Sequence, residues 1–165
     1  MTATSLVDTN ILVYRIDPRD PVKQRVAHDL LRGGFSDETL VLPHQAIVEF
    51  VAAVTRPRRE LGGAPLLSRA DALLEAESLV GQFPVLYPDA EVLRTAMRGM
   101  AMYSLPWFDA HLWAYAEAHG IGEILSEDFE HGRHYGRVRA VDPFLVAADR
   151  VHELPPLYSG QAERA

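Results

Sequence analysis

Four acidic residues of this 165-residue chain have types and positions suited to binding a divalent metal ion: Asp8, Glu49, Asp109 and Asp128. Asp8 closes the apolar run 5–7, and Asp128 follows the apolar pair 124–125. Asp109 lies in the first turn of a predicted helix that leads into that pair, and Glu49 lies on the helix after a second predicted strand. Because ligands of open parallel sheets bind at the carboxyl ends of the strands, we expect the four carboxylates to meet near one edge of a sheet.

A cluster of carboxylates supplies the oxygen ligands that Mg²⁺ prefers, and this ion usually keeps several of its waters. The bound ion lowers the pKa of a water molecule and offsets the charge of a phosphoryl group. Without a cation, close carboxylates repel one another and some of them take up protons. The four acids therefore predict a metal site that acts on a phosphoryl group.

Each acid also has a simpler interpretation. Asp8 can form an Asx-turn that caps a helix, Asp128 can cap a turn, and Asp109 suits the positive end of a helix dipole. Glu49 is harder to explain, because its helix is otherwise apolar and a buried charge is costly unless it is paired or bound to metal. A narrow polar stripe shared with Gln45 is the alternative for Glu49.

The composition is that of a globular domain, with 48% hydrophobic and 24% charged residues. No apolar run approaches the roughly 18–20 residues that span a membrane, and the N-terminus lacks a signal-peptide pattern, so we expect a cytoplasmic protein. The absence of cysteine excludes disulfides, thiolate catalysis and cysteine-type zinc sites. The net charge of −7 argues against nucleic-acid binding when taken alone, but metal ions can lie between acidic residues and a phosphate.

Short apolar runs alternate with longer amphipathic ones. The predicted strands cover residues 5–7, 39–42, 85–87, 124–125 and 138–141. The predicted helices cover residues 10–15, 22–32, 43–55, 68–82, 89–103 and 106–119. Gly33 and Gly34 are expected to end the second helix. The alternation indicates a parallel sheet with right-handed crossovers in an α/β sandwich. We expect one domain over residues 1–145 and a C-terminal tail over residues 146–165 that contacts a partner or a second copy.

Four segments resemble the motifs of PIN-domain nucleases, especially the VapC-like toxins of bacterial toxin–antitoxin pairs. They are the opening run 6–14, the helix that carries Glu49, the run 108–114, and the run 124–132 with the later 141–144. The resemblance covers roughly residues 4–145, and the ordered set is more specific than any single motif. It implies a PIN-like three-layer α/β/α sandwich with a central, mainly parallel sheet.

The resemblance further implies hydrolysis of RNA phosphodiesters by a water activated by Mg²⁺ or Mn²⁺. It maps Asp8, Glu49 and Asp109 onto the family's metal-binding acids and Asp128 onto a fourth, more variable one. Supporting polar residues of the family correspond to Thr9, Asn10 and Ser126. It also implies a homodimer, and a cognate antitoxin whose C-terminal segment fills the active-site groove.

The fourth acidic position has two adjacent candidates, Glu127 and Asp128, of which only one needs to face the metal. We favour Asp128, because Glu127 would point to the opposite side if the strand continued past Ser126. Two arginine-rich segments are candidates for contacts with RNA, since arginine makes bidentate contacts with phosphate. The residues in question are Arg56, Arg58 and Arg59, and then Arg133 and Arg137 after the fourth acid. A solvated loop is the simpler interpretation of the first segment.

Three other functions have to be compared with this pattern of acids. Phospho-acceptor switches and aspartyl-phosphate phosphatases also gather acids at strand ends, but they rely on a nearby lysine. The only lysine, Lys23, is expected on an early helix away from the later strand ends, and position 10 is Asn where phosphatases need a second Asp. A non-catalytic PIN-like scaffold would be expected to lose acids that this chain keeps. A nuclease that processes RNA or cuts DNA without acting as a toxin stays open.

Overall fold

The computed structural model describes residues 5–152. Its strands are β1 (Ser5–Val7), β2 (Leu40–Pro43), β3 (Val85–Leu86), β4 (Glu123–Leu125), β5 (His134–Tyr135) and β6 (Val138–Val141). Its helices are α1 (Thr9–Ile16), α2 (Pro21–Ser36), α3 (His44–Thr55), α4 (Arg69–Gln82), α5 (Ala90–Tyr103), α6 (Trp107–His119) and α7 (Pro143–His152). A short 3₁₀ turn, η1 (Arg59–Leu61), separates α3 from α4.

The strands form one sheet in the order β3-β2-β1-β4-β6-β5. All neighbours are parallel except β5 and β6, which form an antiparallel pair at one edge. The α/β class with a mainly parallel sheet is therefore confirmed, and β5 is an element that the sequence pattern did not predict. β1 and β4 are direct neighbours, with Val7 paired to Leu125, so the residues that follow these two strands leave the sheet side by side.

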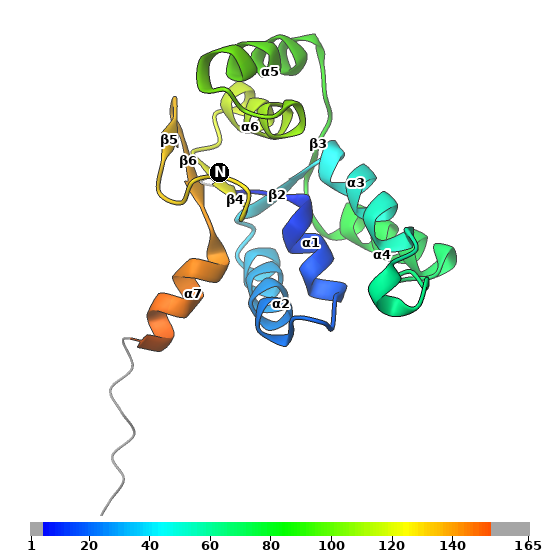
Figure 1. The fold of residues 1–165 in the computed structure, drawn as a ribbon. Helices are drawn as coiled ribbons and strands as arrows, with labels where there is room; N and C mark the ends of the chain where they lie inside the picture. Colours follow the sequence, from blue (N-terminus) through cyan, green and yellow to red (C-terminus); the bar gives the residue numbers. More distant parts are fainter. Residues whose placement is uncertain (1–4, 153–165) are drawn as a thin grey trace, which may run out of the picture.

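Successive residues of the central strands face opposite layers, as the two-residue period of a strand requires. Leu6 and Ile124 belong to one buried cluster with residues of α5 and α6. Val7 and Leu125 belong to a second buried cluster with residues of α1, α2, α3 and α4. Figure 1 shows this arrangement, with α5 and α6 on one side of the sheet and the remaining helices on the other. The molecule is thus the predicted three-layer sandwich.

The second helix does not stop at its two glycines, which corrects the sequence-based boundary. α2 continues to Ser36, and Gly34 is buried against β2. A Cβ at Gly34 would lie 2.2 Å from the side chain of Leu40, so this glycine permits a close helix–strand approach. Gly99 has the same role between α5 and α6, where a Cβ would lie 2.4 Å from the ring of Trp113.

The predicted boundary between residues 145 and 146 falls inside α7. This helix begins at Pro143, and the side chain of Asp142 accepts hydrogen bonds from the backbone amides of Phe144 and Leu145 at 2.8 and 3.3 Å. Phe144 packs against the buried cluster beneath α1 and α2. The remainder of the predicted tail, residues 153–165, lies outside the described residues. Within residues 5–152, no helix combines the length and apolar character needed to cross a membrane.

Candidate active site

Asp8 lies at the carboxyl end of β1 and is the N-cap of α1. It is only 8% exposed. One carboxylate oxygen accepts a hydrogen bond from the backbone amide of Thr9 at 2.6 Å. The other accepts from Asn10 Nδ2 at 3.0 Å and from Ser126 Oγ at 2.5 Å. The capping interpretation is therefore correct for one oxygen, whereas the second oxygen is held by side chains that a helix cap does not require.

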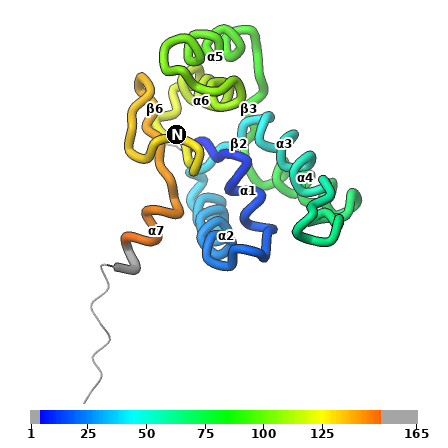
Figure 2. The backbone as a smooth tube through the Cα atoms, viewed as in Figure 1, coloured from blue at the N-terminus to red at the C-terminus, as the bar shows by residue number. Residues whose placement is uncertain are grey.

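Asn10 and Ser126 connect Asp8 to Asp128. Asn10 Nδ2 lies 3.2 Å from Asp128 Oδ2, and Ser126 Oγ accepts from the backbone amide of Asp128 at 3.0 Å. In Figure 2 the segment after β4, drawn in yellow, passes beside the start of α1, drawn in dark blue. The parallel pairing of β1 with β4 thus brings together two acids from opposite ends of the sequence, as the strand-end argument predicts.

Glu49 lies on α3 and is held by two polar neighbours. Thr9 Oγ1 donates to Glu49 Oε2 at 3.1 Å, and Gln45 Nε2 donates to Glu49 Oε1 at 2.8 Å. Gln45 Nε2 also donates to the carbonyl of Phe108 at 3.1 Å, so its Oε1 is left to accept from His111 Nδ1 at 3.1 Å. Both the polar stripe with Gln45 and the orientation towards the other acids are therefore present.

Asp109 lies in the first turn of α6 and is half-buried. Burial raises its pKa above the ordinary value, and the negative charges of Asp128 and Glu49 raise it further. No hydrogen bond contributes to this pKa shift within the described residues, in contrast to Asp8. Asp109 is thus the least constrained of the four acids.

The carboxyl group of Asp8 has a strongly raised pKa. Burial raises this pKa from 3.8 to about 7, against the opposing effect of the hydrogen bonds from Ser126 and Thr9. The negative charges of Asp128 and Glu49 add to the rise. A carboxylate that is desolvated and surrounded by like charge favours either a proton or a bound cation.

All four acids line one open cavity of about 340 Å³. The predicted supporting residues Thr9 and Asn10 line the same cavity, whereas Ser126 lies fully buried behind Asp8. The structure therefore brings the predicted acids and their supporting residues to one place. It also adds Gln45 to this cavity, a residue that the sequence pattern identified only as a neighbour of Glu49.

Glu127 lines the cavity too, but its carboxylate is occupied elsewhere. Tyr14 Oη donates to Glu127 Oε1 at 2.6 Å, and Lys23 Nζ forms a short ion pair with Glu127 Oε2. The expectation that Lys23 lies away from the later strand ends is therefore wrong. The reason is that α2 packs against α1, which places Lys23 over the segment after β4.

The predicted RNA-contact arginines occupy different places. Arg58 lines the cavity, where it donates to the carbonyl of Ala53 at 3.1 Å, while Arg56 and Arg59 are exposed. Arg133 and Arg137 lie on or beside the β5–β6 hairpin, pair with Glu130 and Glu117, and do not line the cavity. A further cation at the cavity, not identified from the sequence, is Arg19. Its guanidinium binds Asp17 at 2.5 Å, and this pairing keeps the pKa of Asp17 below its usual value.

The residues at the cavity fit a hard divalent cation by the chemistry of their donors. All four acids offer oxygen ligands, and the side-chain oxygen of Asn10 is buried without a hydrogen-bond partner among residues 5–152. In that part of the chain, no three acidic or histidine side chains already enclose a position for a metal ion. The fit therefore rests on donor type and charge.

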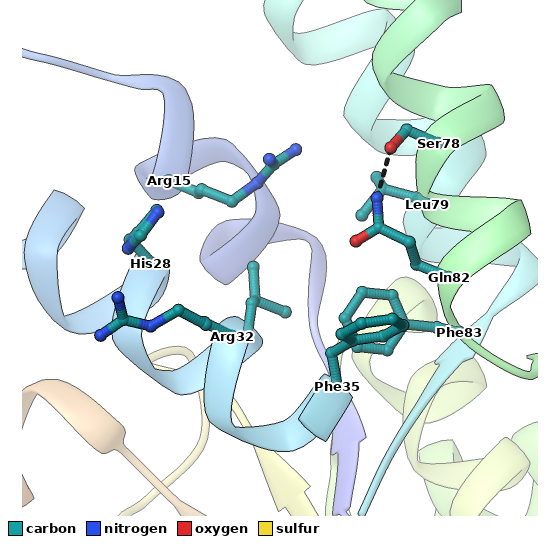
Figure 3. Close-up of a pocket in the computed structure, with 9 residues that line it drawn as sticks. Arg15, His28, Arg32, Phe35, Ser78, Leu79, Gln82 and Phe83 are labelled. Atoms are coloured by element: carbon teal, nitrogen blue, oxygen red, sulfur yellow. Dashed lines mark hydrogen bonds between the residues drawn. The ribbon is translucent and has the colours of Figure 1, made fainter. Parts of the chain in front are cut away.

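A smaller cavity of about 220 Å³ lies between α2 and α4 and contains none of the four acids. Figure 3 shows Arg15, His28 and Arg32 on one side and Ser78, Leu79 and Gln82 on the other. The rings of Phe35 and Phe83 meet edge to face at the same cavity. Glu75 neutralises Arg15 at 2.7 Å. None of the residues that line this smaller cavity is acidic, so the acid-lined cavity is the candidate metal-binding site.

Solved structures share this fold at low sequence identity. The DNA-bound VapBC structure from Salmonella typhimurium has a TM-score of 0.63 and 13% identity, with 87% of this chain and 99% of that chain covered. VapBC2 from Rickettsia felis, bound to a promoter DNA fragment, has a TM-score of 0.60 and 10% identity, with coverages of 83% and 96%. VapC20 of Mycobacterium tuberculosis, a toxin described as cleaving the sarcin-ricin loop, has a TM-score of 0.54 and 13% identity, with coverages of 74% and 87%.

Comparisons of the sequence identify the family of the chain. No curated protein matches it significantly. Residues 5–137, however, match the PIN domain. This range contains all four acids of the cavity and both strands whose ends carry Asp8 and Asp128. The chain therefore belongs to the PIN domain family.

Proposed function

We propose that this protein is a metal-dependent endoribonuclease that hydrolyses RNA phosphodiesters at the cavity lined by Asp8, Glu49, Asp109 and Asp128. The observation that carries the proposal is the bridge of Asn10 and Ser126 between two acids, with the other two acids on the same cavity. The pKa of Asp8, raised by burial to about 7, supports it, because a bound metal ion would stabilise the charged carboxylate that burial disfavours.

Asp8, Asp109, Glu49 and Asp128 would hold Mg²⁺, with Mn²⁺ as a substitute. When bound, Mg²⁺ supplies an acidified water and offsets the charge of the scissile phosphate. The chain's own residues provide the positioning. Ser126 and Asn10 fix the carboxylate of Asp8, and Thr9 with Gln45 fixes that of Glu49. Such supporting bonds determine how well a metal ligand is oriented.

Contacts with the RNA backbone are assigned first to Arg58, because it lines the cavity. Arg56 and Arg59 are the next candidates, because they are exposed on the same segment as Arg58. Arg133 and Arg137 would contact RNA only if the RNA strand extended across the β5–β6 hairpin. Arginine contacts of this kind position a phosphate without reading the base.

The biological role that we propose is that of a toxin paired with a cognate antitoxin, acting as a homodimer in the cytoplasm. The likeness of the fold to VapBC assemblies and to a toxin described as cleaving the sarcin-ricin loop supports this role. Within the proposal, residues 1–145 form the nuclease domain and residues 146–165 contact a partner or a second copy. RNA processing or DNA cleavage would use the same acids, and a scaffold role would not require them.

The test is cleavage of RNA by the purified full chain with and without Mg²⁺. Cleavage is expected to need Mg²⁺ or Mn²⁺, to stop with excess chelator, and to be lost in Asp8→Asn. Glu77→Gln is the matched control, since Glu77 is an exposed acid on α4 away from the cavity. Cleavage that persists in chelator or in Asp8→Asn contradicts the proposal. A parallel assay on DNA tests whether the protein is a DNA nuclease. A parallel RNA assay with the protein encoded by a neighbouring gene added tests whether that protein acts as an antitoxin.

Binding of the metal has its own readout. A ligand that binds only the folded state raises the free energy of unfolding by about 2.7 kcal/mol at 100 times its Kd. The melting temperature is therefore expected to rise with millimolar Mg²⁺ in the unmodified protein and in Glu77→Gln. No rise in the unmodified protein would contradict a metal site in the folded state.

A further inference from the structure

Lys23 is the only lysine of the chain, and its ammonium group is surrounded by side chains from three other segments. Its Nζ pairs with Glu127 after β4 and donates to Tyr14 Oη of α1 at 3.0 Å. The same ammonium lies 4.4 Å from the centre of the Tyr14 ring and 5.1 Å from that of Phe144 on α7. The two rings contact each other edge to face at 5.1 Å. An ordinary surface ion pair does not require an additional hydrogen bond and two aromatic rings around its ammonium group.

Glu127 is the group on which these contacts converge. One of its carboxylate oxygens accepts from Tyr14 and the other from Lys23. Its neighbour Asp128 points instead to Asn10, within the network around Asp8. Glu127 and Asp128 both line the cavity, but they have different hydrogen-bond partners and therefore different roles.

We propose that Lys23, assisted by Tyr14, is a positioning residue that withdraws Glu127 from the metal site and thereby leaves Asp128 as its fourth acid. This inference rests on the proposed function. Without Lys23, the carboxylate of Glu127 would face a cavity that already holds four acids. A released Glu127 would compete with Asp128 for the cation and add negative charge where the RNA backbone must approach.

The proposal predicts an unusual pair of effects for Lys23→Met, which removes the ammonium group but keeps an unbranched side chain at this position. Mg²⁺ should bind about ten-fold more tightly, because an extra carboxylate becomes available. Cleavage of RNA at saturating Mg²⁺ should fall about ten-fold, because the ligand set is rearranged. Damage to the fold alone would weaken both binding and cleavage. Mg²⁺ binding is measured by calorimetry and by the melting shift.

Two further variants complete the test. The double variant Lys23→Met with Glu127→Gln should return Mg²⁺ affinity and cleavage to within about three-fold of the unmodified protein, since no carboxylate is left to release. Arg25→Met is the matched control, because it removes an exposed cation from the same helix. If the double variant is as defective as Lys23→Met, Lys23 has only a packing role and the proposal fails.

A spectroscopic readout keeps the test independent of catalysis and of the stability of Lys23→Met. Because Lys23 is the only lysine, its ¹⁵N-labelled ammonium gives a single assignable signal. This signal should be protected from solvent exchange and should shift in Tyr14→Phe. A freely exchanging ammonium overturns the proposal. If the unmodified protein neither binds Mg²⁺ nor cleaves RNA, the proposed function fails. If it does both and Lys23→Met behaves identically, only this inference fails.

Discussion

The two halves of the acid-lined cavity are built differently. We call Asp8 and Asp128 the inner half because they follow the neighbouring central strands β1 and β4, and the side chains of Asn10 and Ser126 connect them. Glu49 and Asp109 lie in the outer half, on helices α3 and α6 from opposite layers of the sandwich. Glu49 accepts hydrogen bonds from two side chains, whereas no hydrogen bond from residues 5–152 contributes to the pKa of Asp109. We therefore infer that the inner half is the more preorganised of the two, and that Asp109 gives the outer half freedom to adjust.

Within the proposed function, the two halves would contribute differently to metal binding. Two strand ends in a parallel sheet are held by the backbone ladder, so ligands placed there need little reorganisation to accept a cation. In the proposed metal site, ligands on two helices would depend on how the layers pack and would adjust to a bound cation. The cost of the inner half is a buried carboxylate among like charges, which is visible in the raised pKa of Asp8.

The largest expected effect compares Asp8→Asn with Asp109→Asn. Both should slow RNA cleavage on the order of 10³-fold, because each removes a carboxylate that the metal ion needs. At pH 8 without metal, Asp8→Asn should raise the melting temperature clearly more than Asp109→Asn, since Asp8 is the more deeply buried charge and asparagine retains the helix cap. Differential scanning calorimetry measures this. A lower melting temperature in Asp8→Asn would show that Asp8 serves the fold rather than a metal.

The pH dependence of the free energy of unfolding tests the effect of the buried Asp8 carboxylate alone. The folded protein holds a proton on Asp8 up to a pKa of about 7, whereas the unfolded chain loses it near 3.8. The metal-free protein should therefore lose stability as the pH rises from about 4 to about 7, by at most about 4 kcal/mol. Denaturant unfolding of the unmodified protein and of Asp8→Asn gives the difference. Saturating Mg²⁺ should abolish the loss, and equal pH profiles for the two proteins would contradict the prediction.

Ser126→Ala tests the support of the inner half. The substitution removes a fully buried hydroxyl that donates to Asp8 and accepts from the amide of Asp128. Stability should fall by about 1–3 kcal/mol, because buried polar groups lose their partner. Mg²⁺ affinity and cleavage should fall about 10–100-fold, as for other groups that orient a metal ligand. Ser78→Ala, at an exposed position of α4, is the control, and equal effects of the two variants would contradict a supporting role for Ser126.

Much of the fold and the positions of the acids follow from the sequence. The apolar runs that end at Asp8 and before Asp128 define two strands, and parallel strands place their carboxyl ends together. The supporting roles of Asn10 and Ser126 came only from the family resemblance, yet both side chains lie in the predicted place. These features depend on local patterns and on a general rule of sheet topology.

The rest depends on packing between distant segments. Gly34 looks like a helix stop until its close approach to Leu40 is known. Lys23 looks remote from the site until α2 is seen to lie on α1, which also decides the direction of Glu127. An arginine cluster indicates charge but not location, and so only Arg58 of the five candidate arginines lines the cavity. Tertiary contacts of this kind have no signature in a single sequence.

Gln45→Ala should have the smallest effect, and it tests whether the outer half is as loosely held as its contacts indicate. Glu49 loses one donor but keeps Thr9. Cleavage should fall by only about three-fold and stability by less than about 1 kcal/mol, because the lost hydrogen bonds are partly exposed to water. Steady-state kinetics and denaturant unfolding measure both, beside Gln82→Ala as an exposed control outside the cavity. A loss as large as that of Ser126→Ala would mean that Gln45 fixes Glu49 as firmly as Ser126 fixes Asp8. The two halves of the site would then be equally preorganised, and the freedom assigned to the outer half would be confined to Asp109.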